Sequence, residues 1–250
     1  MVSIAQYPIY IPTKGRWDRC PTAKLLEREN IPFRLVVEPQ EAENYAPIGE
    51  LLALPISDGG IAASRTWIRK HALESGSEWH WQMDDDLKGF YRYDSGKKVP
   101  CPIAEAIDRA EALVRTERFT DEIPGVAIIG FSLSAFLALG EPTNQINHGC
   151  YSFVLVRNDV PFTWRDGVGY EDVDFCLQAI ALGWRTVTLG FYAFHSAPLG
   201  KSSGGNRDTM YADGGMRACR ALERKWPGVV SIARYARGPG AKIAWNKLVR

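Results

Sequence analysis

The sequence lacks the features that would assign it to several specialised classes of protein. Its 250 residues include five cysteines and no C-x-x-C pair, which argues against a zinc site or a disulfide framework and favours a reducing compartment. No apolar run approaches the roughly 18–20 residues of a membrane span, and the first residues lack the basic segment of a secretory signal. We therefore expect a cytoplasmic protein with no membrane partner and no obligate protein partner.

Net charge is also nearly absent, at +1, but the charges are unevenly placed. Beyond residue 216 Glu223 is the only acid, whereas the cations there are Arg217, Arg220, Arg224, Lys225, Arg234, Arg237, Lys242, Lys247 and Arg250. A basic end of this kind can follow a polyanion such as nucleic acid, or it can simply be solvated. Charge alone leaves both interpretations open.

What the sequence does contain is a mostly apolar run, 79–83, that ends in Asp84, Asp85 and Asp86. Side chains alternate along a strand, so we expect Asp84 and Asp86 to share one side and Asp85 to face the other. Three acids at the end of a buried strand repel one another unless a cation neutralises them. Mg²⁺ or Mn²⁺ with phosphate co-ligands would do so; a solvated acidic turn is the alternative.

Strand-like and helix-like segments alternate along the chain. We expect strands at 4–11, 33–37, 51–56, 79–86, 126–129, 151–156 and 184–194. We expect helices at 20–29 and 61–73, from 102, from about 172 and near 211–226. This order predicts an α/β domain with a mixed, mostly parallel sheet, and ligands beyond the carboxyl ends of its strands. We assign residues 1–206 to that domain and 207–250 to a helical, basic extension packed on it or trailing from it.

Two early segments suit a nucleotide. The loop that leaves the first strand carries Thr13 and Arg16, and Glu38 ends the second strand, where a carboxylate can bind a ribose or a base. Arg65 stands early in the helix over 61–73 and could reach a diphosphate or an aspartate of the acidic stretch. Ordinary turn and surface residues are the alternative for each.

Three later segments carry groups with catalytic chemistry. A glycine-rich loop over 165–169 leads into a helix with Asp172 in its first turn, where the dipole keeps a carboxylate ionised, although acids that cap helices are common. A strand then delivers His195, which could complete a metal shell or be a structural histidine. The Gly/Ser-rich segment 198–206, which includes Lys201, is typical of a lid over phosphates.

Taken in order, these motifs resemble the GT-A nucleotide-sugar glycosyltransferases across residues 4–206. More narrowly, segments 11–16, 81–86 and 169–174 resemble the phage TET-associated glycosyltransferases, a group implicated in adding sugars to 5-hydroxymethylpyrimidines in phage DNA. The resemblance implies a single GT-A domain with a Rossmann-like sheet, a nucleotide-sugar donor (UDP-sugar expected) and Mn²⁺ or Mg²⁺. It also implies an acceptor of DNA containing 5-hydroxymethylcytosine, and the host cytoplasm as the location.

The resemblance also implies roles for individual residues. The donor-binding residues would be Pro12, Thr13, Arg16, Glu38, Arg65, Asp84, Asp85 and Lys201. Within this set Asp84 would lie near the ribose or the donor sugar, while Arg65 or Lys201 would meet the diphosphate. Asp86 and His195 would bind the metal, with Asp85 as a substitute for Asp86 if the strand turns early.

Asp172 would be the catalytic base, with Glu171 beside it; Asp174 competes for that role but points to another side of the helix. We therefore predict direct displacement with inversion, because no nucleophile for a retaining route is identifiable. Two rival functions remain: transfer to a glycan, lipid or protein, and a nucleic-acid-binding module on an inactive fold of this type.

Overall fold

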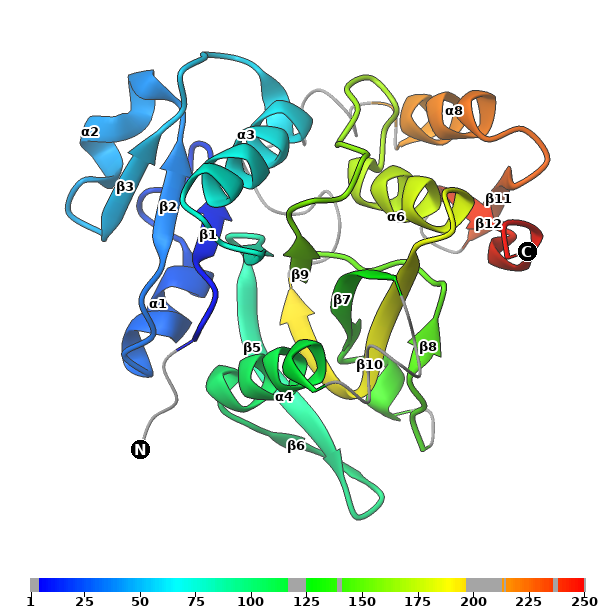
Figure 1. Ribbon diagram of the computed structural model, residues 1–250, viewed down its shortest axis with the longest axis horizontal. Coiled ribbons are helices and arrows are strands. Elements are labelled where there is room, and N and C mark those ends of the chain that lie inside the picture. Colours follow the sequence, from blue (N-terminus) through cyan, green and yellow to red (C-terminus); the bar gives the residue numbers. More distant parts are fainter. Residues whose placement is uncertain are drawn as a thin grey trace.

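A mixed β-sheet runs through the centre of the protein, described here from a computed structural model over residues 5–116, 125–138, 141–196, 213, 215–235 and 238–249 (Figure 1). Its strands lie in the order β3-β2-β1-β4-β9-β7-β10-β5-β6, with β8 beside β10. Their bounds are β1 Ile9–Pro12, β2 Arg34–Val37, β3 Glu50–Ala53, β4 Trp79–Met83, β5 Leu87–Asp94, β6 Lys97–Pro100, β7 Val126–Leu133, β8 Gln145–Ile146, β9 Phe153–Arg157 and β10 Arg185–Ser196.

Helices cover both faces of this sheet. Their bounds are α1 Pro21–Arg28, α2 Ala42–Tyr45, α3 Gly60–Glu74, α4 Ile103–Arg115, α6 Glu171–Ala181 and α8 Met216–Lys225, with 3-10 turns η1 Pro39–Glu41, η2 Phe136–Ala138 and η3 Trp245–Lys247. Apolar residues of α1 and α4 pack on one face, and those of α3 and α6 on the other (Figure 1). The predicted α/β class, with a mixed sheet flanked by helices, is confirmed.

The half of the sheet formed by β3, β2, β1 and β4 is parallel. Every residue of β1 and of β4 is buried, as expected for parallel strands covered by helices on both faces. Because this half follows the predicted strand–helix alternation, the carboxyl ends of β1, β2 and β4 lie along one edge. The loops that leave those ends carry the candidate donor-binding residues.

Strand β9 reverses the direction of the sheet at its centre. It is antiparallel to both β4 and β7. The sequence allowed an antiparallel strand or one at the margin of the sheet, and the first of these is correct. Its apolar residues Phe153 to Val156 are buried, so it belongs to the core and not to an edge. The reversal brings the start of β9 beside the end of β4, and Asp84 N donates to Ser152 O at 2.7 Å.

Strands β5, β6 and β8 of this sheet were not predicted from the sequence. Residues 87–100 form the β5–β6 hairpin, whose mixture of lysines, tyrosines and glycines has neither a clear apolar alternation nor a helical period. Strand β10 bends so that its first half is parallel to β7 and its second half is antiparallel to β5. The bend extends the sheet to the hairpin and carries His195 back toward the end of β4.

The C-terminal segment packs on α6. Helix α8 and the hairpin of β11 (Val230–Tyr235) and β12 (Gly238–Ile243) share an apolar cluster with α6, and that cluster includes Val173, Leu177 and Leu222. An added Cβ at Gly169, where φ is +58°, would lie 2.5 Å from Ala218 Cα. The loop before α6 therefore requires glycine at the point where α8 approaches.

Asp174 joins this segment to the rest of the protein. Its fully buried carboxylate accepts hydrogen bonds from Arg165, from Gln178 Nε2 at 2.9 Å and from Trp226 Nε1 at 2.7 Å. Arg165 also forms an ion pair with it. A carboxylate with this many donors has its charge balanced and its lone pairs filled, so it is a structural group.

We expect Asp174→Asn to lower the free energy of unfolding by about 3 kcal/mol, because removing one partner of a buried ion pair leaves the other uncompensated. Guanidinium denaturation of the purified protein measures this change. Asp159→Asn is the matched control, since Asp159 pairs with Arg157 at the surface and such pairs contribute about 1 kcal/mol or less. Equal stabilities of the two variants would contradict the structural role of Asp174.

Candidate functional site

The three aspartates after β4 occupy a turn, so the alternation expected for a continuing strand does not apply. β4 ends at Met83, and Asp85 and Asp86 form the turn that leads into β5. Thr22 at the start of α1 holds this turn, because its hydroxyl donates to Asp84 O at 2.5 Å and accepts from Leu87 N at 3.0 Å. Each carboxylate therefore meets different surroundings.

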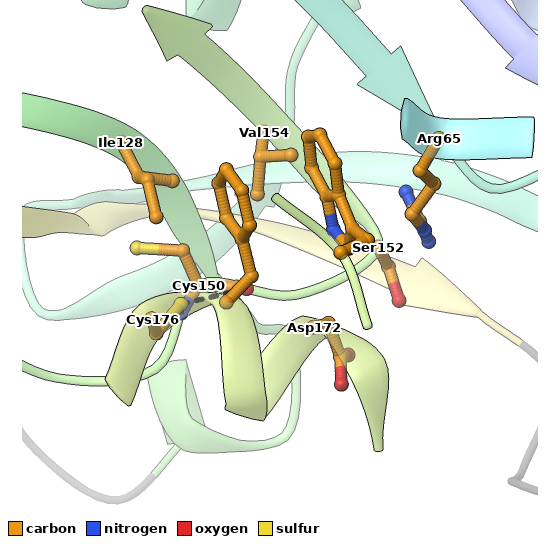
Figure 2. A pocket seen from close by; sticks show the side chains of 9 residues that line it. Arg65, Ile128, Cys150, Ser152, Val154, Asp172 and Cys176 are labelled. Atoms are coloured by element: carbon orange, nitrogen blue, oxygen red, sulfur yellow. Dashed lines mark hydrogen bonds between the residues drawn. The ribbon is translucent and has the colours of Figure 1, made fainter. Parts of the chain in front are cut away.

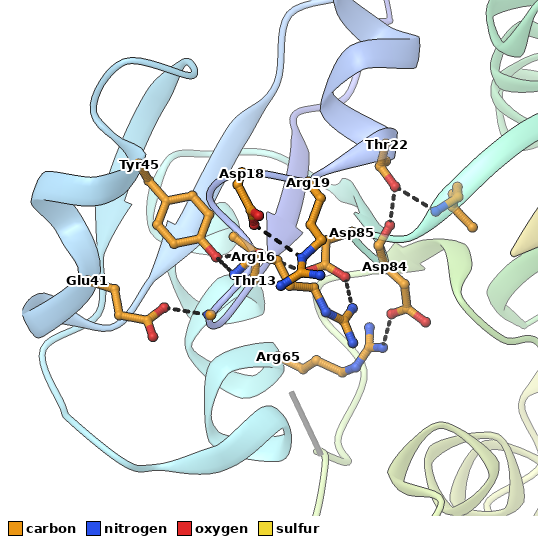
Figure 3. A network of polar contacts seen from close by, with 12 residues as sticks. Thr13, Arg16, Asp18, Arg19, Thr22, Glu41, Tyr45, Arg65, Asp84 and Asp85 are labelled. Atoms are coloured by element: carbon orange, nitrogen blue, oxygen red, sulfur yellow. Dashed lines mark hydrogen bonds and ion pairs between the residues drawn. The ribbon is translucent and has the colours of Figure 1, made fainter. Parts of the chain in front are cut away.

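Asp84 forms an ion pair with a buried arginine. Arg65 Nη2 donates to Asp84 Oδ1 at 2.7 Å, and Arg65 Nε lies 3.4 Å from Glu171 Oε1 (Figure 3 shows the Asp84 pair). Burial opposes the charge of Arg65, yet Asp84, Glu171 and Asp172 together raise its pKa above the ordinary value. One guanidinium from α3 thus connects the end of β4 to the first turn of α6.

A chain of buried polar groups holds Arg65 from behind. Arg65 Nη1 donates to Gln82 Oε1 at 3.1 Å, and Gln82 Nε2 lies 2.8 Å from His80 Nε2. The second ring nitrogen of His80 meets the amide oxygen of Asn158. Burial lowers the pKa of His80 to about 3, so its ring is neutral and adds no charge beside Arg65.

Asp85 faces the first loop and orders it. Thr13 Oγ1 donates to Asp85 Oδ2 at 2.6 Å, and Arg16 forms an ion pair with the other carboxylate oxygen (Figure 3). Burial raises the pKa of Asp85, and Arg16 and Thr13 oppose that shift. These contacts place Asp85 beneath the predicted nucleoside-binding loop, with its carboxylate occupied.

Two further residues complete the loop and were not identified from the sequence. The Tyr45 hydroxyl lies 2.9 Å from Thr13 Oγ1 and accepts from Arg16 N at 2.8 Å. Glu41 Oε2 accepts from Gly15 N at 2.9 Å. Both come from η1 and α2, a stretch with no sequence motif, so only the fold brings them to the loop.

The other predicted donor-binding residues lie at the same edge of the sheet. Pro12 is the last residue of β1 and is buried. Glu38, directly after β2, is buried and accepts from Lys14 Nζ at 2.7 Å and from Gln40 Nε2 at 2.7 Å. Lys201 and the predicted lid over 198–206 lie outside the described residues.

Glu171 and Asp172 occupy the first turn of α6. Burial, then the charge of Glu171, raises the pKa of Asp172 to about 7, and the nearby Arg65 opposes the shift. Burial also raises the pKa of Glu171. A carboxylate that titrates near neutral pH has the proton affinity that a general base needs.

A small cavity lies against Asp172. Its volume is about 10 Å³, close to the smallest cavity that can hold one water molecule. Figure 2 shows Arg65, Ser152 and Asp172 at one end and the thiols of Cys150 and Cys176 at the other. Most of the remaining lining is apolar, and it keeps water away from Asp172.

Asp172 and Asp174 differ in what they contact. The carboxylate of Asp174 accepts hydrogen bonds from Arg165, Gln178 and Trp226. Within the described residues the carboxylate of Asp172 accepts one, from Val173 N at 2.7 Å. Of the two, Asp172 therefore has lone pairs available for a ligand. Asp174 cannot accept a proton from a substrate without losing its structural contacts.

The predicted metal ligands Asp86 and His195 lie at adjoining strand ends. Asp86 precedes Leu87, which pairs with Ser196 next to His195. Burial and the charges of Asp84 and Asp85 raise the pKa of Asp86 to about 6, and its carboxylate has no hydrogen-bond or ion-pair partner among the described residues. His195 is exposed, with Nδ1 3.4 Å from Ser134 Oγ.

Across the described part of the chain, no three His, Cys, Asp or Glu side chains are grouped to hold a metal ion. A cation bound together with phosphates needs only one or two protein ligands. The partly buried carboxylate of Asp86 is a suitable donor for such an ion. The residues present therefore fit a metal shared with a diphosphate better than a metal held by protein alone.

The sequence profile of the TET-Associated Glycosyltransferase family matches residues 7–203. The chain belongs to this family. The predicted resemblance is thereby confirmed, and the protein is a glycosyltransferase. All of the described site residues discussed above fall within the matched range.

Comparisons with curated proteins and with solved structures give no further information on function. No curated protein gives a significant match. A structure titled as A197 from STIV is 14% identical, covers 77% of this chain and 85% of its own, and has a TM-score of 0.45. A mannose-1-phosphate geranyltransferase from Thermus thermophilus is 18% identical over 89% of this chain and 64% of its own, with a TM-score of 0.31. Similarities this low do not bear on function.

No helix among the described residues is long and apolar enough to span a membrane.

The pKa of Asp172 predicts how activity depends on pH. If Asp172 is the base it must be ionised, so kcat/KM should rise with pH through about 7. Glu171→Gln removes a charge that raises this pKa, and we expect the rise to move to lower pH. Glu74→Gln, an exposed change on α3, should leave the profile in place; a profile that Glu171→Gln leaves unmoved or shifts upward would contradict the assignment.

Proposed function

We propose that this glycosyltransferase moves a sugar from a nucleotide-sugar, with UDP-sugar as the expected donor, to the hydroxyl of 5-hydroxymethylcytosine in DNA. Asp172 would act as the base of an inverting displacement. The observation that carries this proposal is the position of Asp172: it titrates near pH 7 in the first turn of α6, and Arg65 links that turn to Asp84 at the end of β4.

The donor side of the proposal rests on the carboxyl ends of β1, β2 and β4. The loop with Thr13 and Arg16 is already ordered by Asp85 and Tyr45, so a nucleoside would meet a prearranged surface, and ordering costs little on binding. Glu38 stands beside this loop. Asp84 is one-third exposed, which leaves one side of its carboxylate for the ribose or the sugar.

Asp86 and His195 would hold a divalent cation, Mn²⁺ or Mg²⁺. When bound, that ion would offset the negative charge that develops on the departing diphosphate. Ser134 lies at His195 Nδ1, which leaves Nε2 for the metal, since the partner of one ring nitrogen determines the role of the other.

The reaction then needs one general base beside the hydroxyl that receives the sugar. Asp172 would take the proton of the hydroxymethyl group as its oxygen attacks the anomeric carbon from the face opposite the diphosphate. The bond from that carbon to the diphosphate breaks in the same step, so configuration inverts. Arg65 pairs with the carboxylates of Asp84 and Glu171 and partly offsets their repulsion of Asp172, and a base in this position contributes about 10²–10⁴-fold.

The acceptor is proposed from the family and from the charge of the C-terminal end. The family is described as TET-associated, and its implied acceptors are hydroxymethylated pyrimidines in DNA. A hydroxymethyl group on C5 protrudes into the major groove, or the base can be flipped out to reach a buried carboxylate. The basic end would add contacts with phosphates and make binding depend steeply on salt.

We expect Asp172→Asn to bind nucleotide-sugar as the wild type does and to lose transfer by about 10²–10⁴-fold, because the amide keeps the shape and cannot accept the proton. Calorimetry with the donor and a transfer assay measure the two properties. Asp166→Asn, an exposed change in the preceding loop, is the control and should keep its activity. Near-normal transfer by Asp172→Asn would refute the role of Asp172.

The acceptor is tested by incubating the protein with Mn²⁺, a panel of nucleotide-sugars, and DNA with or without 5-hydroxymethylcytosine. Digestion to nucleosides and mass spectrometry should show one added hexose on the hydroxymethylated base alone. EDTA should abolish the product, and Asp86→Asn should raise the Mn²⁺ concentration needed. Transfer to a glycan or peptide panel and none to DNA would reject the DNA acceptor while leaving the transferase intact.

A further inference from the structure

Helix α8 has one buried face and one cationic face. Ala218, Cys219 and Leu222 are buried against the protein. Arg217, Arg220 and Arg224 are exposed, and their spacing of three and then four residues places them along one side of the helix. The three guanidinium groups form a row, which we call the arginine row.

Nothing acidic in the described residues neutralises the arginine row, since none of its members lies within ion-pair distance of a carboxylate there. The two nearby acids have other partners. Glu223 Oε1 accepts from Ile232 N at 3.3 Å, and Asp213 accepts from the backbone at the start of α8, including Arg217 N at 2.9 Å. The surface therefore keeps its positive potential, which is complementary to a polyanion.

The arginine row is held in a fixed position relative to α6, the helix that carries Asp172. Helix α8 touches the first turns of α6 at several points: Gly169 meets Ala218, Val173 and Leu177 pack with Leu222, and Trp226 donates to Asp174. Asp172 directly precedes Val173 in the first turn of α6. A ligand bound along α8 is therefore held at a constant position with respect to Asp172.

We propose that the arginine row binds the phosphate backbone of the DNA acceptor and sets the position of the target base at Asp172. This inference rests on the proposed DNA acceptor. From Arg217 to Arg224 the helix rises about 10 Å, which equals about three axial steps of ~3.4 Å between successive phosphates of one strand. The row can thus contact successive phosphates of a single strand, a contact that positions DNA without reading its sequence.

The test uses the full-length protein and a fluorescent DNA duplex, whose binding is measured by anisotropy over a series of salt concentrations. The variant carries Arg217→Gln, Arg220→Gln and Arg224→Gln together. Its slope of log K against log salt should fall by about 2–3, close to one for each phosphate that the variant no longer binds. KM for hydroxymethylated DNA should rise at least tenfold, while donor binding and the melting temperature stay as in the wild type.

A matched control removes three exposed cations elsewhere, by Lys24→Gln, Arg28→Gln and Lys97→Gln on α1 and β6. An equal loss of DNA binding in the control would show a general charge effect and overturn the proposal, as would unchanged binding by the arginine-row variant. Wild-type protein that binds vesicles containing phosphatidylserine through this row, and not DNA, would overturn it in favour of a membrane surface. Anisotropy measures DNA binding without sugar transfer. A protein that binds DNA through the arginine row but transfers no sugar to it would therefore contradict the proposed function and not this inference.

Discussion

The arrangement of the site depends on the buried ion pairs of Arg65. Its guanidinium is almost inaccessible to water and meets Asp84 and Glu171 from two segments that are far apart in the chain. Charges of one sign cannot share a poorly hydrated region unless an opposite charge lies among them. Arg65 supplies that charge, and the neutral His80 behind Gln82 adds none. The first turn of α6 can therefore lie against the end of β4 with Asp172 ionisable near neutral pH.

Much of the parallel half of the fold was predictable, because its signals are local. Apolar runs followed by turn residues indicated β1, β2 and β4, while Pro21 and the Gly59-Gly60 break marked the starts of α1 and α3. The β5–β6 and β11–β12 hairpins were missed, since residues such as Tyr91, Lys98 and Gly240 show no apolar alternation. These strands form by pairing, β5 with the distant β10 and the others with their hairpin partners. Strand β9 was recognised, but its central place depends on which neighbours it pairs with, and a sequence window does not contain that information.

In the candidate site, too, some features were predicted from local sequence and others depend on contacts made by the fold. The order of motifs anticipated that Arg65 reaches the acidic stretch and that Asp172 stands in the first turn of α6, and the structure shows both contacts and positions. The assumption that β4 continues through its aspartates was wrong, because Thr22 captures the backbone there and turns the chain. Tyr45 could not be found from the sequence either. Its role exists only through contacts with Thr13 and Arg16, about thirty residues away.

The reversed direction of β9 has a consequence for how such a site can vary. In a wholly parallel sheet, only segments that follow strands reach the ligand edge. Here a segment that precedes a strand, Cys150 to Ser152, also arrives there, with Ser152 O bound to Asp84 N and Cys150 lining the cavity beside Asp172. The surroundings of Asp172 can thus change through this entering segment, while the loops that follow β1, β2 and β4 stay unchanged.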